Sequence, residues 1–361
     1  MANNARMRDS VLRKARENRA AGFVAGKALQ IAMDALQQGR EQVRLRLDGR
    51  EFNLTHLDKV YFPEAGYTKR DVLSYYTQVS PFLLPFLRER PLVLHRYPNG
   101  ITGSAFYQKE AGPHIPDWIR TVRIPSETKQ QEVGYFLIDD LASLLYITNL
   151  GCIEHNPFST RADDLERPDY MFVDLDPTEG TDFSRVIRAA QVVGEVLRRA
   201  QLKSFVKTSG ATGLHIFIPI ERRYGFEQVR AFLEIVAMLA SERENGLLTR
   251  TFRVQDRPKQ TVFFDVRQNA AGQSLAAVFS LRPREGAPIS TPISWAEVKM
   301  RLKPEKWDIK AVLQDLQERA KLWRDFWKYR QRIENALQAL ERKASAAPLR
   351  VSGAPRKDRE D

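Results

Sequence analysis

Hydrophobic and polar residues alternate most clearly in the stretch QVRLRLDGREFNLTH, residues 42–56. A period of two with an Asp-Gly pair at its centre predicts two strands joined by a tight turn. The stretch TKRDVLSYYTQVSPFLLPFL then changes to helical spacing behind Thr68, whose residue type caps helix starts, and it predicts a helix. PLVLHRYPNG predicts a strand that ends in a Pro-Asn-Gly turn. Residues 41–165 are therefore expected to mix short strands with helices.

A more regular pattern occupies residues 166–295. Apolar runs predict strands in DYMFVDLDP, on both sides of the glycines in SFVKTSGATGLHIFIPI, in QTVFFDVRQN and in LAAVFSLR. Amphipathic spacing predicts helices in DFSRVIRAAQVVGEVLRRAQL and GFEQVRAFLEIVAMLASE. Helices laid on a mainly antiparallel sheet make the expected fold class α+β.

The two ends of the chain differ from this middle. Residues 1–40 carry eight Lys or Arg against three Asp or Glu, and Phe23, Ala28, Ile31 and Leu36 could form a thin apolar stripe. This predicts a basic helical arm, with a poorly ordered tail as the equally weighted alternative. A central domain is expected over residues 41–310, with a first lobe over 41–165 and the main sheet over 166–295. Charged helices are expected over 311–342, and the polar residues 343–361 predict a disordered tail.

Charge and cysteine content narrow the class of protein. The chain has 57 Lys or Arg against 45 Asp or Glu, a net charge of +12, which points to nucleic acid ahead of a membrane surface as its partner. A single cysteine excludes an internal disulfide and a multi-cysteine zinc site. With neither a signal peptide nor an apolar run of membrane-spanning length in view, the expected setting is the cytoplasm, with no membrane partner.

Three carboxylates follow apolar strand patterns. Asp174 and Asp176 end DYMFVDLDP, and side chains two apart in a strand share a face, roughly 6.5 Å apart. Two like charges on one face are costly unless a cation neutralises them, and oxygen donors of this kind suit Mg²⁺ or Mn²⁺. Pro177 cannot donate to a sheet, so the pair is expected at a rim. Asp265 ends QTVFFDVRQN in the same way. Taken alone, an Asp-x-Asp pair is more often two solvated aspartates before a turn.

A glycine-rich turn lies between these carboxylates in the sequence. In TSGATGLHIFIPI, Gly210 and Gly213 permit a tight turn, and Ser209 with the turn amides could cradle phosphate oxygens. His215 then starts a strand on the face opposite Ile216 and could donate to a phosphate. A hairpin turn with a structural histidine is the alternative. In combination with the three carboxylates, the turn indicates one phosphate-and-metal site.

The order Asp-Leu-Asp-Pro, Ser-Gly-x-x-Gly-x-His and a later lone Asp resembles the archaeo-eukaryotic primase superfamily. It is most similar to the polymerase domain of bacterial DNA ligase D. The similarity covers roughly residues 43–310 and includes LTHLDKVYFPEAGYTKRDVLSYY, RYPNGITGSAFYQKEA, GCIEHNPFSTR and SLRPREGAPISTPISWAEV. The resemblance implies a two-lobed primase-polymerase fold with an RRM-like catalytic sheet flanked by helices.

The resemblance also implies an activity and a set of site residues. It implies template-directed nucleotide addition in non-homologous end joining, with two Mn²⁺ or Mg²⁺ ions and NTP or dNTP substrates, on DNA ends and on gapped DNA with a 5′-phosphate. Ku and a separate DNA ligase are the expected partners, in a nucleoid-associated cytoplasmic setting. The implied residues are Asp174, Asp176 and Asp265 for metal; Ser209, Gly210, Gly213, His215, Arg282, Phe106, Tyr107 and Lys109 for the nucleotide; and Lys59, Lys69 and Arg96 for DNA.

The chain departs from the family pattern at two positions. Thr212 stands between the two glycines, where relatives often have lysine, which removes a cation from the triphosphate site. Asn156 stands where many relatives have histidine, with His155 beside it, and the sequence leaves open which of the two faces the site. A ligase nucleophile is absent, because Arg46 occupies that position in RLDG, and five histidines are too few for a His-rich nuclease segment. The chain is therefore expected to act as a polymerase module without ligase chemistry.

Three other functions remain open on this scaffold. The first is a primase or lesion-bypass polymerase, which would synthesise strands on single-stranded templates. The second is an inactive module that binds DNA ends, although three clustered anions would not help such a module. The third is a two-metal nuclease, for which a phosphate-cradling turn is less suited.

Overall fold

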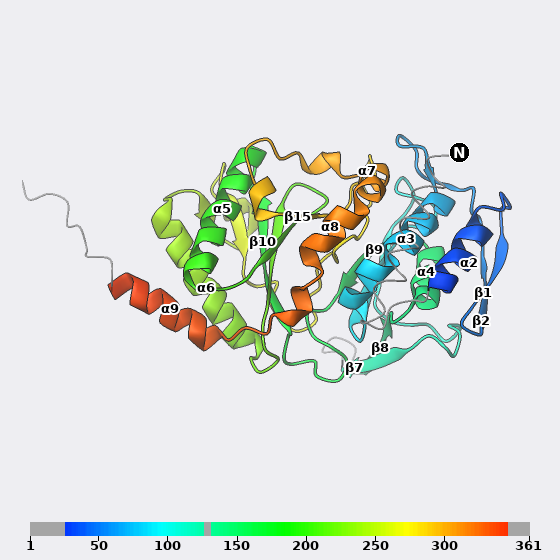
Figure 1. Ribbon diagram of the computed structural model, residues 1–361, viewed down its shortest axis with the longest axis horizontal. Coiled ribbons are helices and arrows are strands. Elements are labelled where there is room, and N and C mark those ends of the chain that lie inside the picture. Colours follow the sequence, from blue (N-terminus) through cyan, green and yellow to red (C-terminus); the bar gives the residue numbers. More distant parts are fainter. Residues whose placement is uncertain (1–25, 126–130, 346–361) are drawn as a thin grey trace, which may run out of the picture.

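The computed structural model describes residues 26–125 and 131–345, which form two lobes side by side, with the C-terminal helices between them and beyond (Figure 1). Phe23 and the tail residues 346–361 lie outside the described residues, so those parts of the arm and tail predictions remain predictions. Within the described residues, no helix is long and apolar enough to span a membrane.

The N-terminal lobe contains a five-stranded antiparallel sheet and three helices. In the sheet, β5 pairs with β6, β8 and β9, and β8 pairs with β7. The elements are α2 (Gly26–Leu36), β1 (Val43–Leu47), β2 (Arg50–Leu54), β3 (Val60–Phe62), β4 (Tyr67–Thr68), α3 (Lys69–Leu87), β5 (Pro91–Arg96), β6 (Phe106–Gln108), β7 (Thr121–Pro125), β8 (Glu132–Leu137), α4 (Leu141–Asn149) and β9 (Cys152–Pro157).

The predicted hairpin and helix of this lobe are confirmed. Asp48 and Gly49 both have positive φ, 49° and 80°, as the mirror-image turn of a two-residue hairpin requires. Thr68 caps α3, since its side chain accepts from the Asp71 amide and the Asp71 carboxylate accepts from the Thr68 amide. The helix continues through Pro81 because the Ser80 hydroxyl donates to the Thr77 carbonyl, which has lost its usual partner.

Helix α2 corrects part of the arm prediction. Residues 26–36 are helical as expected, but Ala28, Leu29, Ala32 and Leu36 are buried in the core, so this segment belongs to the lobe. Ile31, which was expected on the apolar stripe, is 38% exposed. The reason is helical geometry: steps of four residues lead from Ala28 to Ala32 and Leu36, Leu29 widens the buried face on one side, and Ile31 lies beyond its other edge.

The second lobe is built on a six-stranded sheet with the order β13-β14-β10-β12-β11-β15. Every neighbouring pair is antiparallel except β13 with β14. This agrees with the predicted α+β class. Its elements are β10 (Tyr170–Pro177), α5 (Phe183–Arg199), β11 (Phe205–Thr208), β12 (Leu214–Pro219), α6 (Phe226–Arg243), β13 (Leu248–Thr249), a short 3-10 helix (Val254–Asp256), β14 (Val262–Asp265) and β15 (Pro292–Ile293).

The two faces of this sheet have different surroundings. Helices α5 and α6 cover one face, where alternate residues such as Met171, Val173 and Ile216 join their apolar core. The opposite face is aromatic at one end, where Phe172 and Phe217 pack toward the C-terminal helices. At its other end the same face becomes polar. This face of the sheet therefore has an aromatic half, which packs on the C-terminal helices, and a polar half, which carries the candidate site.

The predicted strand LAAVFSLR is wrong. Residues 275–282 form a buried irregular loop whose only strand-like pairing is an isolated bridge between Leu281 and Ile289. Phe279 has a φ of 63°, which a continuous strand cannot accommodate. The segment is apolar because it is buried under neighbouring chain, and its amides bond to several partners, including the His155 and Ser290 carbonyls.

The C-terminal helices belong to the shared core. The elements are 3-10 helices at Trp295–Glu297, Pro304–Lys306 and Phe326–Lys328, with α7 (Ile309–Gln314), α8 (Leu316–Trp323) and α9 (Ile333–Ser345). Trp323 and Phe326 stack at 5.4 Å and contact the aromatic half of the sheet through Phe217 and Tyr170. The predicted helices are confirmed, although α9 extends to residue 345, past the expected start of the tail.

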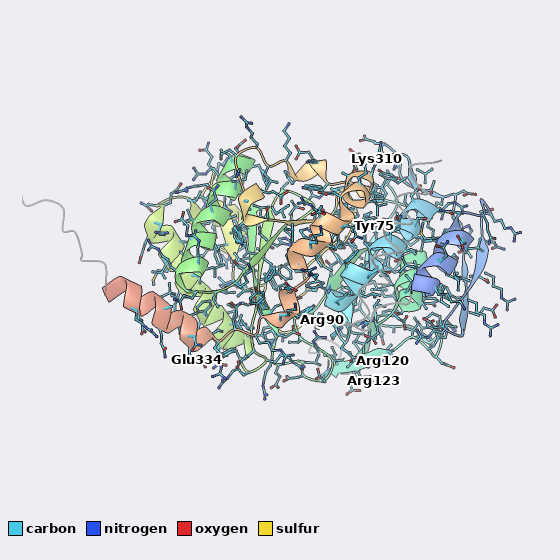
Figure 2. The ribbon with its side chains drawn as sticks, in the orientation of Figure 1. Tyr75, Arg90, Arg120, Arg123, Lys310 and Glu334 are labelled. Carbon is cyan, nitrogen blue, oxygen red and sulfur yellow. The ribbon has the colours of Figure 1, made fainter. Side chains whose placement is uncertain are left out.

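A buried ion pair joins the lobes. The fully buried Arg90 donates to both carboxylate oxygens of Asp169 at 2.6 and 2.8 Å and to the Ser159 carbonyl at 2.8 Å. Its guanidinium also lies over the rings of Tyr170 and Trp327, at 4.9 and 5.2 Å from their centroids. Figure 2 shows Arg90 near the middle of the molecule. One side chain thus connects the N-terminal lobe, the main sheet and the C-terminal segment.

Candidate active site

The three predicted carboxylates lie on the polar half of the main sheet. Asp174 is paired in register with His215 on one side and with Asp265 on the other. Asp176 is two residues further along β10, on the same face, just before the strand ends at Pro177. The strand assignments and the shared face therefore agree with the sequence analysis.

Burial and mutual repulsion make the charged form of these carboxylates unfavourable. Burial raises the pKa of Asp174 to about 6, although Lys207 and Arg282 oppose the shift. The charge of Asp174 and then burial raise the pKa of Asp176 to about 6. The pKa of Asp265 is also raised, by burial and then by Asp174. All three groups would be stabilised by a nearby cation.

The donor set fits a hard divalent cation, which prefers carboxylate oxygens. The buried Oδ1 atom of Asp174 has no hydrogen-bond partner, and it lies 3.2 Å from His215 Nε2. Asp265 directs Oδ1 to the amides of Arg267 and Gln268, at 2.9 and 3.2 Å. Across residues 26–125 and 131–345, no three acidic, His or Cys side chains already form a closed metal-binding group. The metal role of the three aspartates therefore stays a prediction.

A buried lysine sets the orientation of His215. Lys207 Nζ donates to His215 Nδ1 at 2.7 Å, which leaves the proton of a neutral imidazole on Nε2, the atom facing Asp174. Burial and then the charge of Lys207 lower the pKa of His215 well below its ordinary value. The Lys207 pKa is itself lowered well below 10.5, by burial and by Arg282. His215 is thus presented as a neutral donor toward the carboxylates.

The Ser209 turn lies directly beside this group. Ser209 Oγ accepts from the amides of Ala211 and Gly213, both at 3.0 Å, so these two amides close the turn upon itself. The amides of Ala211 and Gly213 are therefore already used within the turn, and the phosphate cradle predicted from Ser209 and the turn amides remains a prediction. A Cβ on Gly213 would approach the Leu175 carbonyl to 2.4 Å, and one on Gly210 would approach Arg282 Cγ to 2.6 Å. Both glycines are required by close packing against the carboxylate strand and Arg282.

Arg282 reaches the turn from the irregular loop. Its Nη1 donates to the Ser209 carbonyl at 2.7 Å, and its Nε lies 3.3 Å from Glu154 Oε1. Glu154 also lies 3.3 Å from His95 Nδ1. Burial alone would raise the pKa of Glu154, but the hydrogen bond with His95 and the charge of Arg282 lower it overall. A buried anion from the N-terminal lobe therefore holds the predicted nucleotide-binding arginine in place.

Tyr76 of α3 holds the two backbone segments that carry the Glu154–Arg282 ion pair. Its fully buried hydroxyl accepts from the Leu281 amide at 2.9 Å and donates to the Ile153 carbonyl at 2.5 Å. Leu281 precedes Arg282 and Ile153 precedes Glu154, so a single oxygen atom ties together the backbones that carry the ion pair.

The predicted aromatic residues lie at the opening of the site. Phe106 and Tyr107, on β6, are 45% and 65% exposed. The Tyr107 ring stacks on His95 at 4.0 Å, and Arg96 lies over Phe106 at 5.1 Å from the ring centroid. Lys109 is exposed just beyond the strand. The arrangement offers base-stacking surface beside Arg282.

The structure distinguishes Asn156 from its neighbour. His155 is fully buried in the N-terminal lobe, where it contacts Tyr76 at 4.5 Å, and burial lowers its pKa to about 3. Asn156 lies on the same side of β9 as Glu154 and hydrogen-bonds to its carboxylate. Asn156 is therefore the residue that faces the site.

The lysines predicted to bind DNA, Lys59 and Lys69, lie near Arg96. Lys69 is only 4% exposed and donates to the Thr55 carbonyl at 2.8 Å, and its pKa is lowered to about 8 by burial and by the charges of Lys59 and Arg96. Lys59 donates to the Pro98 carbonyl and to Asn99 Oδ1, at 3.2 and 2.9 Å. Three neighbouring cations held by neutral oxygens suit an anion such as a terminal phosphate.

The combined replacements Lys59→Ala and Lys69→Met are expected to remove most of the preference for phosphorylated gaps. Each hydrogen bond to a charged group contributes about 1.5–3 kcal/mol, so affinity for a 5′-phosphorylated gap should fall about tenfold or more beyond any loss on an unphosphorylated gap. Fluorescence anisotropy on both duplexes measures this difference. Arg46→Ala, which removes an exposed charge from the same lobe, is the control and should weaken both duplexes equally. Equal losses in the double variant would show that its lysines are general surface charge.

Thr212 is exposed in a cavity of about 430 Å³ between the Ser209 turn and the start of α5. Lys303 and Met300 line the opposite side of this cavity.

Thr212→Lys is expected to lower the KM for nucleoside triphosphates several-fold, because it adds a cation beside the turn, with little effect on DNA affinity. Nucleotide titration against a fixed gapped duplex measures the change. The gain should shrink with monophosphates, and a rise in KM would place Thr212 away from the phosphates.

Two charged residues of this site escaped the sequence analysis. Lys207 and Glu154 are each the one Lys, Arg, Asp or Glu residue of their strand, and that isolation is the signal that could have identified them. Their partners His215, Arg282 and His95 come from distant segments, so pairing could not be inferred from spacing.

Comparison with known proteins supports the same assignment. The family described as LigD, primase-polymerase domain matches residues 68–323. The multifunctional non-homologous end joining protein LigD of Pseudomonas aeruginosa is 30% identical over 291 residues, covering 79% of this chain and 34% of that protein. The bifunctional LigD of Bacillus subtilis is 28% identical over 280 residues, covering 77% of this chain and 44% of that protein. This chain thus spans less than half the length of either relative.

A solved structure extends the likeness to the fold. The polymerase domain of Mycobacterium tuberculosis ligase D in complex with DNA superimposes with a TM-score of 0.69 and 26% sequence identity, covering 75% of this chain and 96% of that one. The resemblance, the fold class and the nucleotidyltransferase type of enzyme predicted from the sequence are confirmed. On its sequence and its fold, this chain belongs to the LigD primase-polymerase domain family.

Proposed function

We propose that this protein is a template-directed nucleotidyltransferase that fills gaps and extends 3′ ends at DNA double-strand breaks during non-homologous end joining. The observation that carries the proposal is the gathering of Asp174, Asp176 and Asp265 on one sheet face beside the Ser209 turn. The names of its relatives and the DNA bound to its structural neighbour support the same activity.

The reaction joins the 3′ oxygen of a DNA strand to the α-phosphorus of a nucleoside triphosphate. The bond between the α-phosphorus and the oxygen bridging to the β-phosphate breaks, pyrophosphate leaves, and the proton of the 3′ hydroxyl passes to water. Asp174, Asp176 and Asp265 would hold two Mg²⁺ or Mn²⁺ ions, which when bound stabilise the negative charge of the attacking and leaving oxygens.

The remaining residues of the chain bind and orient the substrates. Arg282 and His215 would donate to phosphate oxygens, and Ser209 keeps the turn in shape beside them. Phe106 and Tyr107 offer their exposed rings to a base, a contact that tolerates any sequence. The Lys59, Lys69 and Arg96 group would hold the 5′-phosphate across the gap.

Partners and location belong to the same proposal. A net charge of +12 supports binding along DNA. Ku would bring the broken ends together, and a separate DNA ligase would seal the filled gap, in the cytoplasm at the nucleoid. The ribose or deoxyribose preference would be read from both nucleotide types in the assay below.

Primer extension tests the proposal directly. The protein is incubated with a 5′-phosphorylated gapped duplex, Mn²⁺ or Mg²⁺, and single NTPs or dNTPs. Addition of the nucleotide complementary to the template supports the proposal. Binding to the duplex without any addition would instead favour an inactive end-binding module, and synthesis on single strands without a primer would favour a primase.

A further inference from the structure

We propose that Phe252 and Val254 form a stacking subsite for the 3′-terminal base of the DNA strand being extended. The inference rests on the proposed polymerase function and adds a binding site for the primer end. Both residues lie in the segment between β13 and β14, and both are unusually exposed for apolar side chains, at 52% and 74%.

Arg257 fixes this segment on the carboxylate face of the sheet. Its guanidinium lies over the Phe263 ring at 3.6 Å, and Phe263 is the residue paired in register with Asp176. The same guanidinium donates to the carbonyls of Thr251 and Phe252, both at 3.0 Å. The backbone of Phe252 is therefore anchored on the surface that carries the carboxylates.

Arg267 connects the Phe252 ring to Asp265. The Arg267 amide donates to Asp265 Oδ1 at 2.9 Å, and its guanidinium lies over the Phe252 ring at 4.5 Å from the centroid. One face of the ring is thus occupied by a cation, while half of the side chain remains open to solvent. A single residue, Arg267, therefore separates the aromatic surface from the predicted metal ligand Asp265.

An aromatic ring backed by a guanidinium suits a nucleic-acid base. A base stacks on the free ring face without regard to its identity, and the cation attracts the adjoining phosphate. Val254 extends the apolar surface, and the exposed Arg253 between them adds positive charge. Neither feature contributes to the folded core, where burial would be needed.

Position selects the 3′-terminal nucleotide as the occupant. Two other exposed aromatic residues, Phe106 and Tyr107, lie in the N-terminal lobe with the proposed phosphate-binding lysines. Phe252 lies in the lobe of the main sheet, where Arg267 connects its ring to Asp265, and on the proposed function the attacking hydroxyl approaches the carboxylates from this lobe. Two stacking surfaces on different lobes would hold the two nucleotides that are to be joined.

The test uses a gapped duplex whose primer ends in 2-aminopurine, a base whose fluorescence falls when it stacks. Binding is measured without nucleotide or divalent cation, so the signal does not depend on chemistry. The full chain and its Phe252→Ala, Phe252→Trp and Tyr329→Ala variants are compared. Tyr329 is the matched control, because it is 38% exposed and has Lys203 near its ring, but it packs on Phe205 at the aromatic end of the sheet.

Phe252→Ala is expected to lose the fluorescence change and to bind the primer end about tenfold more weakly, a change of about 1.4 kcal/mol. Phe252→Trp should keep both signals, and Tyr329→Ala should match the unaltered protein. Equal binding and quenching by Phe252→Ala would overturn the subsite. So would a signal that follows 2-aminopurine in the template and not in the primer.

The same experiment separates the subsite from the polymerase proposal. If the unaltered protein extends the primer and Phe252→Ala behaves identically in both assays, the subsite is wrong and the polymerase stands. If quenching depends on Phe252 but no nucleotide is ever added, the subsite is supported and the polymerase proposal fails.

Discussion

Asp174→Asn is expected to reduce nucleotide addition at least about a thousand-fold while leaving affinity for gapped DNA unchanged. The change removes one predicted metal ligand. Because charge stabilisation by a metal lowers the barrier by several kcal/mol, and each 1.4 kcal/mol changes the rate about tenfold, its loss should slow the reaction by this amount. The lysines predicted to bind phosphate, Lys59 and Lys69, are untouched. Single-turnover extension and anisotropy on one duplex measure the two quantities. Normal extension by the variant would remove Asp174 from the metal site.

The same variant is expected to be more stable than the unaltered protein when no metal is present. Burial raises the Asp174 pKa from 3.8 to about 6, so the native state binds the proton more tightly than the unfolded chain does. The contribution of Asp174 to stability is therefore largest at low pH and is lost as pH rises from 3.8 through about 6, and the asparagine side chain avoids that loss. At pH 7.5 the variant should gain roughly 1–3 kcal/mol, and the gain should shrink at pH 5.

Adding Mn²⁺ provides the control for this stability change. Binding to the native state stabilises it in proportion to saturation, so Mn²⁺ should raise the melting temperature of the unaltered protein far more than that of Asp174→Asn. Thermal unfolding of the unaltered protein and of Asp174→Asn at pH 7.5 and pH 5, with and without Mn²⁺, measures both the pH effect and the metal effect. An equal response of both proteins to Mn²⁺ would contradict the metal site even if activity were lost.

Arg90→Met is expected to lower the free energy of unfolding by about 3–5 kcal/mol, the cost typical of breaking a buried ion pair. The change leaves Asp169 buried without its bidentate partner and removes two cation–aromatic contacts. Arg161→Met is the matched control, because Arg161 also bonds Asp169 at 2.6 Å and lies over Trp327, but its side chain is 24% exposed. Urea unfolding should show a clearly smaller loss for the control.

A double change and a pH series define this ion pair further. Arg90→Met combined with Asp169→Leu should be more stable than Arg90→Met alone, since the buried carboxylate is removed and the charge left without an acidic partner, that of Arg161, is partly exposed to solvent. Although burial raises it, the Asp169 pKa is lowered overall by Arg90 and Arg161. The pair therefore stabilises the protein at neutral pH, and this contribution should fade as pH drops below the ordinary value of 3.8. A loss in Arg90→Met no greater than in Arg161→Met would contradict the bridging role.

Local patterns predicted those parts of the fold that depend on neighbouring residues. The Asp174 strand, the Thr68 cap and the Asp48–Gly49 hairpin follow from alternation, capping chemistry and turn type. Residues 275–282 misled the analysis because burial between distant segments makes an irregular loop as apolar as a strand. Period alone cannot distinguish these two origins of hydrophobicity.

The candidate site shows the same division. The three carboxylates could be placed from the sequence because each ends an apolar strand. The Lys207–His215 and Glu154–Arg282 pairs could not, because they depend on which segments meet in space. Phe252 could not be identified from the sequence either, because only its exposure, and not its residue type, distinguishes it from a core phenylalanine.

Helix α3 has a consequence for the length of gap that the proposed activity would fill. Lys69 is its first residue and Tyr76, which holds the Arg282 loop, follows seven positions later, so the two anchors are about 10 Å apart along one helix axis. Because both lie on the same buried helix, the distance between the proposed phosphate site and the proposed nucleotide site would stay fixed during synthesis. On the proposed function, a one-nucleotide gap would engage both sites at once, whereas a wider gap would have to fold its uncopied template bases outward or give up the downstream contact.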